Sequence, residues 1–245
     1  MGFNITSSAS SDGVVEHHFT LGEIPGVLWT PEGAAGDRPL ILLGHGGGQH
    51  RTAPPVVAGA RRFAAECGYA AVAVDAPGHG DRPKTPELAQ ALTDMRTRAA
   101  AGEHMFALVA GLHALLAEQA VPEWRAVLDA VAELDCVGRG PVGYLGMSLG
   151  CGLGVPLVAA EPRIRAAVLG LFGARGLAAA AAQITVPVQF VMQWDDERVP
   201  RQESLALFDA FASADKTLHA NPGRHGEVPA FESEDAMRFF SRHLG

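Results

Sequence analysis

Cysteine is scarce in this 245-residue sequence, which contains only three. Cys67, Cys136 and Cys151 form neither an even disulfide framework nor a C-x-x-C pair. A small disulfide-stapled domain is therefore not expected. A reducing cytoplasm is the expected location, and a secreted protein already trimmed of its signal is the alternative.

Basic residues are also in deficit. Lys and Arg total 19 against 27 Asp and Glu, a formal net charge of -8. Proteins that bind nucleic acid usually present a basic stripe, and none is visible here, so no nucleic-acid partner is expected.

Long apolar runs are missing as well. No stretch of about 18 apolar residues is free of charges or helix breakers, so we expect no membrane span. Residues 1–13 lack a basic segment followed by an apolar core, and are expected to form a polar, disordered leader rather than a secretory signal.

What the sequence does contain is an alternation of short apolar strands with helical stretches. With 48% hydrophobic residues, the chain has enough apolar material for one α/β domain over residues 1–245. The pattern predicts a mostly parallel, twisted sheet of about eight strands flanked by helices. Strand-bearing segments are predicted at 14–21 and 26–31 as an antiparallel pair, then at 39–48, 70–80, 141–150, 164–173, 186–196 and 216–220.

One stretch, 82–134, contains no strand-like segment. It predicts one or two helices over 85–120, a break at Val121-Pro122, and a further helix over 123–134. A crossover between parallel strands needs only about a dozen residues, so this stretch carries a helical insertion. Two arrangements remain open: a small cap near the rim of the site, or a long helix packed on the scaffold.

A candidate nucleophile lies in Gly146-Met147-Ser148-Leu149-Gly150, which matches G-x-S-x-G directly after an apolar strand. A serine raised on a tight strand-to-helix turn needs neighbours without side-chain bulk, and glycines two residues away on either side meet that need. The alternative is a glycine-rich turn in which Ser148 only caps the helix. Cys151, one turn further on, is interpreted as a buried, small apolar residue.

Acid and base candidates follow in the order Ser, Asp, His. Asp195 and Asp196 both follow the end of the apolar strand of 186–192, and either is placed to orient an imidazole. His225 lies between glycines in a loop after the last strand, where a histidine has little packing role, so we expect it to be the base. Five other histidines are expected on the surface or on helix faces, with no functional cluster around them: His17, His18, His113, His219 and His243.

The glycine-rich segment Gly44–Gly48 ends another apolar strand. Backbone amides of Gly46 and Gly47, together with that of Leu149, are the expected oxyanion donors. A phosphate-binding loop is disfavoured because the Lys and Ser/Thr of a P-loop are missing. Loops after the strands contribute possible substrate-pocket residues, namely His45, Gly48, His79, Arg82 and Trp194. No H-E-x-x-H motif or close ligand cluster is present, so no metal and no cofactor are predicted.

These segments, HGGG, DAPGHGDR, GMSLG, DDERVP and NPGRHG, resemble the α/β-hydrolase superfamily in the right order over nearly the whole chain. The chain is most similar to the dienelactone-hydrolase-like and small serine carboxylesterase branch. In that branch the acid typically stands four residues before the proline of a Val-Pro pair, which selects Asp196 over Asp195. Two features depart from the pattern: Gln193 stands where glycine is frequent, and the nucleophile is Ser, whereas dienelactone hydrolases use Cys.

The resemblance implies an α/β-hydrolase fold and a serine esterase that cleaves a small-molecule carboxylic ester through an acyl-enzyme. An acyl thioesterase or an amidase or peptidase would use the same residues, and the sequence does not separate them. A non-catalytic binding protein on a hydrolase scaffold is the alternative from another class. A homodimer is left open.

Overall fold

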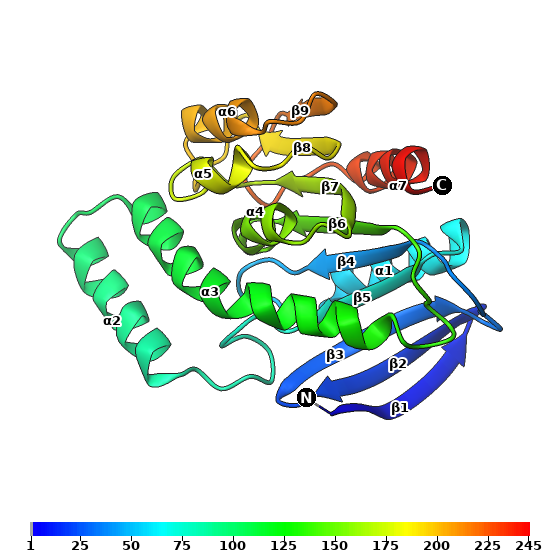
Figure 1. The fold of residues 1–245 in the computed structure, drawn as a ribbon. Coiled ribbons are helices and arrows are strands. Elements are labelled where there is room, and N and C mark those ends of the chain that lie inside the picture. The colour runs from blue at the N-terminus through cyan, green and yellow to red at the C-terminus, as the bar shows by residue number, and fades with distance from the viewer. Residues whose placement is uncertain (1) are drawn as a thin grey trace.

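The computed structural model describes residues 2–245 and has one nine-stranded sheet with seven helices (Figure 1). The strands are β1 (Phe3–Ser11), β2 (Val14–Leu21), β3 (Ile24–Pro31), β4 (Leu40–Gly44), β5 (Ala70–Val74), β6 (Val142–Met147), β7 (Ile164–Gly170), β8 (Val188–Gln193) and β9 (Lys216–Asn221). The helices are α1 (Pro54–Cys67), α2 (Pro86–Ala100), α3 (Met105–Val131), α4 (Leu149–Ala160), α5 (Ala178–Ala181), α6 (Arg201–Ala210) and α7 (Phe231–Leu244).

The strand order is β1-β2-β3-β5-β4-β6-β7-β8-β9. Strands β1, β2, β3 and β5 pair antiparallel, whereas β5, β4 and β6 to β9 pair parallel. The predicted α/β-hydrolase fold, with a mostly parallel sheet, is confirmed. All parallel strands therefore end at one edge, where loops distant in sequence can meet.

The expectation of a disordered leader is wrong. Residues Phe3–Ser11 form β1, which pairs antiparallel with β2 along nearly its whole length. Its side chains are almost all exposed, and the Phe3 ring packs 4.8 Å from that of Phe19. An exposed edge strand needs no apolar alternation when a neighbouring strand supplies its backbone hydrogen bonds. The polar composition of β1 therefore gave no sign of a strand in the sequence.

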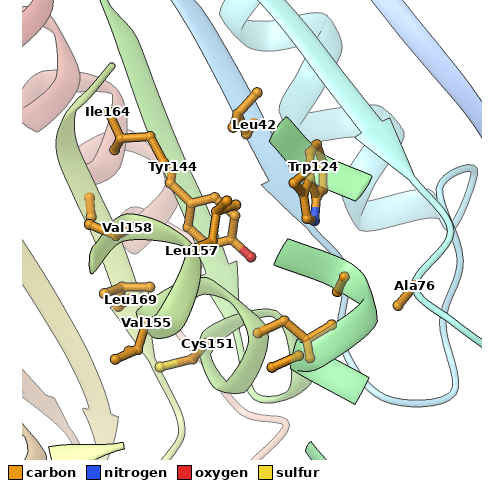
Figure 2. Close-up of a cluster of buried hydrophobic side chains, with 14 of the residues drawn as sticks. Leu42, Ala76, Trp124, Tyr144, Cys151, Val155, Leu157, Val158, Ile164 and Leu169 are labelled. Atoms are coloured by element: carbon orange, nitrogen blue, oxygen red, sulfur yellow. The ribbon is translucent and has the colours of Figure 1, made fainter. Parts of the chain in front are cut away.

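Two hydrophobic layers cover the sheet. On one face, α3 and α4 pack over residues such as Leu42 and Tyr144, and the Trp124 and Tyr144 rings meet edge to face at 6.4 Å (Figure 2). On the other face, α1 and α7 pack over Ile41 and Leu43. Central strands are buried on both faces, which explains their continuous apolar runs.

The helical insertion contains α2 and α3 but breaks elsewhere than predicted. Helix α3 continues without interruption through Pro122, and the break lies at 101–104, where Gly102 has a φ of +88°. A proline inside a helix removes one backbone hydrogen bond. Buried Ala120 and Trp124 on either side hold α3 against the core, and this packing outweighs that loss.

Helix α3 packs along α4, whereas α2 buries only Leu88 and projects from the body (Figure 1). Of the helices within residues 2–245, α3 alone is long and apolar enough to cross a membrane by length and composition.

Another departure concerns His113 on α3, which is buried rather than on an exposed helix face. Its ring stacks on Phe172 with centroids 4.9 Å apart, and its Nδ1 has no hydrogen-bond partner within residues 2–245. Burial, reinforced by His79, lowers the pKa of His113 to about 4.

The close approach of α4 to β4 yields a stability prediction. A Cβ atom on Gly150 would lie 2.4 Å from the backbone oxygen of Gly44, which cannot move without disturbing the central strand. We expect Gly150→Ala to lower the free energy of unfolding by about 1–3 kcal/mol in urea titrations. Gly111→Ala, in open space on α3, is the matched control and should be neutral or stabilising. Equal effects of the two substitutions would contradict this packing.

His113 makes folding pH-dependent. The unfolded imidazole has its ordinary pKa of 6.5 and binds a proton before the folded one as pH falls, so stability is lost below pH 6.5 and is flat above it. This single group should cost about 2 kcal/mol of unfolding free energy between pH 7.5 and 5. In His113→Phe the decrease in unfolding free energy from pH 7.5 to pH 5 should be smaller by that amount. The measurement is urea unfolding of both proteins at the two pH values. An undiminished loss in the variant would assign the pH dependence to other groups.

Candidate active site

The strand-to-helix turn after β6 holds Ser148 in an unusual backbone conformation, with φ 56° and ψ -114°. The Ser148 amide donates to the Gly170 carbonyl at 2.9 Å, which ties the turn to β7. A Cβ on Gly146 would lie 2.6 Å from the Gly150 oxygen, so the turn closes only with glycine there. Strain of this kind is typical of a serine presented at the end of a sheet.

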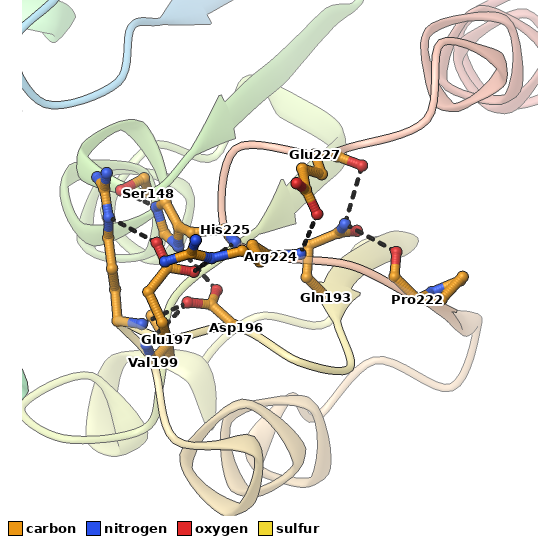
Figure 3. A network of polar contacts seen from close by, with 10 residues as sticks. Ser148, Gln193, Asp196, Glu197, Val199, Pro222, Arg224, His225 and Glu227 are labelled. Carbon is orange, nitrogen blue, oxygen red and sulfur yellow. Dashed lines mark hydrogen bonds and ion pairs between the residues drawn. The ribbon is translucent and has the colours of Figure 1, made fainter.

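Ser148, His225 and Asp196 form one hydrogen-bonded chain (Figure 3). His225 Nε2 lies 3.0 Å from Ser148 Oγ, and His225 Nδ1 lies 2.7 Å from Asp196 Oδ2. The His225 side chain is 8% exposed and that of Asp196 3%. The three residues that sequence analysis selected from distant segments thus meet at the carboxyl edge of the sheet.

Asp196 is held by both of its oxygens. While Oδ2 faces His225, Oδ1 accepts the backbone amides of Arg198 at 2.8 Å and Val199 at 3.0 Å. Asp195 points outward instead, with a side chain 64% exposed and an ion pair to Arg201 at 3.8 Å. The geometry favours Asp196 as the partner of the imidazole.

Two residues that sequence analysis did not select anchor the loop of His225. Gln193 Nε2 donates to the carbonyls of Pro222 at 3.2 Å and Glu227 at 3.0 Å, and Glu197 Oε2 accepts the His225 amide at 3.0 Å (Figure 3). That amide, with the Glu197 backbone and nearby arginines, lowers the pKa of Glu197 to about 2. Of these two residues, only Gln193 gave a signal in the sequence, because it stands where glycine is frequent. An amide side chain at a strand end is suited to bind the carbonyls of a loop.

The glycine-rich loop after β4 is fixed by His45. Its Nε2 accepts the Ala76 amide at 3.0 Å and its Nδ1 donates to the Gly46 carbonyl at 2.9 Å, which defines the tautomer. Burial, the largest effect, lowers the pKa of His45, in keeping with a neutral ring. His45 therefore supports the loop as well as lining the cavity beside Ser148.

Three backbone amides were expected as oxyanion donors, and one of them is already engaged. The Gly46 amide donates to Gln49 Oε1 at 3.1 Å. The amides of Gly47 and Leu149 have no hydrogen-bond partner among residues 2–245, and the two residues approach each other closely. The geometry therefore favours Gly47 and Leu149 for this role.

The other expected pocket residues do not line this cavity. Arg82 is corrected to a structural residue, since it donates twice to Glu123 at 2.6 Å with a side chain only 8% exposed. Trp194 lies on the surface, and the guanidinium carbon of Arg201 lies over its ring, 4.0 Å from the ring centroid of Trp194. His79 packs behind His45 with ring centroids 5.4 Å apart, and Gly48 forms a turn with a φ of +75°.

The cavity beside Ser148 has a volume of about 500 Å³, within the range of small-molecule sites. It lies on the α1 and α7 face of the sheet, and its lining combines apolar side chains with the polar groups near Ser148 and with Arg62, Arg198 and Ser233. None of its lining residues comes from 82–134. The helical insertion thus does not cover this cavity.

Cys151 is fully buried, as predicted, and burial raises the pKa of its thiol to about 12. A neutral, inaccessible thiol is a poor nucleophile. Over residues 2–245, one group of side chains has the donors and spacing for a metal ion: His219, Glu232 and Asp235. Glu232 already accepts from His219 Nδ1 at 2.8 Å and Asn221 Nδ2 at 2.7 Å, so this group joins β9 to α7.

No protein-family model matches the chain, and no curated protein is similar enough to count as a relative. Solved structures do match. A cold-adapted esterase from an Arctic intertidal metagenomic library is 33% identical over 100% of both chains, with a TM-score of 0.78.

Two more distant structures share the fold. An acetyl xylan esterase from a Paenibacillus species is 17% identical over 99% of this chain and 88% of its own, with a TM-score of 0.75. A dienelactone hydrolase from Anabaena variabilis is 21% identical over 95% of this chain and 100% of its own, with a TM-score of 0.64. The full-length similarity to the 33% identical esterase establishes the family: the chain belongs to the small carboxylesterases of the α/β-hydrolase superfamily.

Proposed function

We propose that this carboxylesterase is a serine hydrolase that works through an acyl-enzyme, with Ser148 as nucleophile, His225 as base and Asp196 as the acid that orients it. The observation that carries the proposal is the unbroken hydrogen-bonded chain from Ser148 Oγ through the imidazole to Asp196. Such a chain is the arrangement by which a serine hydroxyl is activated.

In the first step Ser148 Oγ attacks the ester carbonyl carbon, and its proton passes to His225 Nε2. Asp196 keeps the other ring proton on Nδ1 and stabilises the imidazolium that forms. Negative charge builds on the carbonyl oxygen, where the Gly47 and Leu149 amides donate. The amino end of α4 adds a positive dipole at this point.

Collapse of the tetrahedral intermediate breaks the bond to the alcohol oxygen, and His225 returns its proton to the leaving alcohol. Water then attacks the acyl-enzyme with His225 again accepting a proton, which releases the carboxylic acid and restores Ser148. Each step is a proton transfer or an acyl transfer, and it needs only these residues, the ester and water.

Ester substrates are favoured over thioesters and amides because the 33% identical relative is described as an esterase. Leaving-group preference depends on the pocket, so esters, thioesters and anilides of one common acyl group should be compared directly. A binding protein on the same scaffold is disfavoured by the intact chain of three polar residues, since such proteins usually lose a member of the triad.

The nucleophile and base are tested by removal. Ser148→Ala and His225→Ala should each lower kcat/KM for a short-chain nitrophenyl ester by several orders of magnitude, because each removes the activated hydroxyl or its base. A fluorophosphonate probe should label the wild type and Cys151→Ala but not Ser148→Ala. Unlabelled wild-type protein, or near-normal turnover by Ser148→Ala, would overturn the proposal.

The identity of the acid is tested by a matched pair. Asp196→Asn should lower kcat by roughly 10³–10⁴-fold, since an amide no longer fixes the productive tautomer of His225. Asp195→Asn should remain close to wild type because its side chain faces solvent. The reverse order of effects in steady-state kinetics would move the acid by one residue.

A further inference from the structure

The glycine-rich loop after β4 carries a proposed oxyanion donor on backbone that has little to hold it. Gly46, Gly47 and Gly48 have no side chains to pack, and glycine loses more conformational freedom on folding than any other residue. Within the loop, the Gln49 amide donates to the Gly46 carbonyl at 3.1 Å, and the Gly46 amide donates to Gln49 Oε1. These bonds fix the shape of the loop, so contacts with other segments have to fix its position.

Both ends of the loop are bound by two consecutive residues that follow β5. At the first end, the Ala76 amide donates to His45 Nε2 at 3.0 Å. At the second end, Asp75 Oδ1 accepts the backbone amide of Arg51 at 2.8 Å, and Asp75 Oδ2 accepts its guanidinium. Strands β4 and β5 are parallel neighbours, so their carboxyl ends lie side by side and bring these groups within reach.

Asp75 is a completely buried carboxylate that the proposed mechanism does not use. Its Oδ2 also accepts the Asp81 amide at 2.9 Å. A Cβ on Gly80 would lie 2.1 Å from Oδ2, so the segment that follows β5 closes over the carboxylate only with glycine there. Three donors thus compensate for the lost hydration of a buried carboxylate, and two of the three come from Arg51.

The backbone of Asp75 is itself tied to the core. Arg82 donates to the Asp75 carbonyl at 3.2 Å and, through the same guanidinium, to Glu123 on α3 at 2.6 Å. The helical insertion does not line the cavity, yet through Arg82 it supports the residue that holds the glycine-rich loop. The second end of the loop is therefore connected to α3 through buried polar groups.

We propose that Asp75 is a positioning residue for the oxyanion site: by holding Arg51 it fixes the second end of residues 45–51 and keeps the Gly47 amide beside that of Leu149. Asp75 does not line the cavity, so it acts on the reaction only through the loop. The inference rests on the proposed function, because the position of Gly47 affects the rate only when its amide donates to a developing oxyanion.

The test is Asp75→Asn, with Asp81→Asn as the matched control. Whichever way the new amide turns, its NH2 group faces the donors of Arg51 or of Asp81, so part of this attachment is lost. We expect kcat for a short-chain nitrophenyl ester to fall by about 10–100-fold with KM changed by less than about twofold, counted per active site titrated with a fluorophosphonate. Asp81 pairs with the same guanidinium at 2.7 Å, but its side chain is 74% exposed, and Asp81→Asn should stay within about twofold of wild type.

A second measurement separates a displaced donor from general damage to the fold. An alkyl trifluoromethyl ketone forms a negatively charged adduct with an active-site serine, so its Ki should rise by about the same factor as kcat/KM falls. Wild-type kcat per titrated site together with an unchanged Ki would overturn the inference, as would an equal loss in Asp81→Asn.

Should Asp75→Asn fail to fold, Arg51→Gln replaces it. The Arg51 position keeps its backbone bond to Asp75 and loses only the guanidinium, so kcat and Ki should change in the same directions by smaller factors. Unchanged values in this variant would overturn the inference as well. Ser148→Ala keeps the two proposals apart: if it is inactive while Asp75→Asn is normal, only this inference fails, whereas an active Ser148→Ala contradicts the proposed function itself.

Discussion

The hydrogen bond between His225 and Ser148 is the constraint on which the rest of the structure depends, because it joins loops from β6 and β9 across the intervening ends of β7 and β8. Parallel pairing from β4 to β9 brings all these strand ends to one edge. Only then can a 3.0 Å contact form between residues 77 positions apart. The strained turn at Ser148 and the glycines around it serve this one contact.

Supporting hydrogen bonds around the site hold the His225–Ser148 contact in place. Gln193 and Glu197 hold the backbone of the His225 loop, and two backbone amides hold Asp196 from behind. Across the site, His45 fixes the glycine loop through the Ala76 amide. In the proposed mechanism, preorganised groups of this kind need no rearrangement when charge develops, so the supporting bonds matter as much as the side chains proposed to react.

The two faces of the sheet are covered by different helices, and only one of them encloses the cavity. Helices α3 and α4 form the larger core layer, where the helical insertion is packed, and α3 continues through Pro122 because that core holds it. Helices α1 and α7 cover the other face and enclose the cavity. Of the two arrangements left open for 82–134, the structure shows a long helix on the scaffold, with α2 projecting beside it.

The sequence by itself determined the fold class, the strand that delivers Ser148, and the order Ser, Asp, His, because local glycine patterns and apolar runs report backbone geometry directly. Tertiary structure alone decided two further matters. It decided which donors are free, since Gln49 occupies the Gly46 amide and Glu123 holds Arg82, and it ordered the polar leader as β1 by pairing it with β2. Each of these outcomes depends on a partner that folding brings close, often from far along the chain. Local pattern carries no information about such a partner, since long-range packing and hydrogen bonding select it.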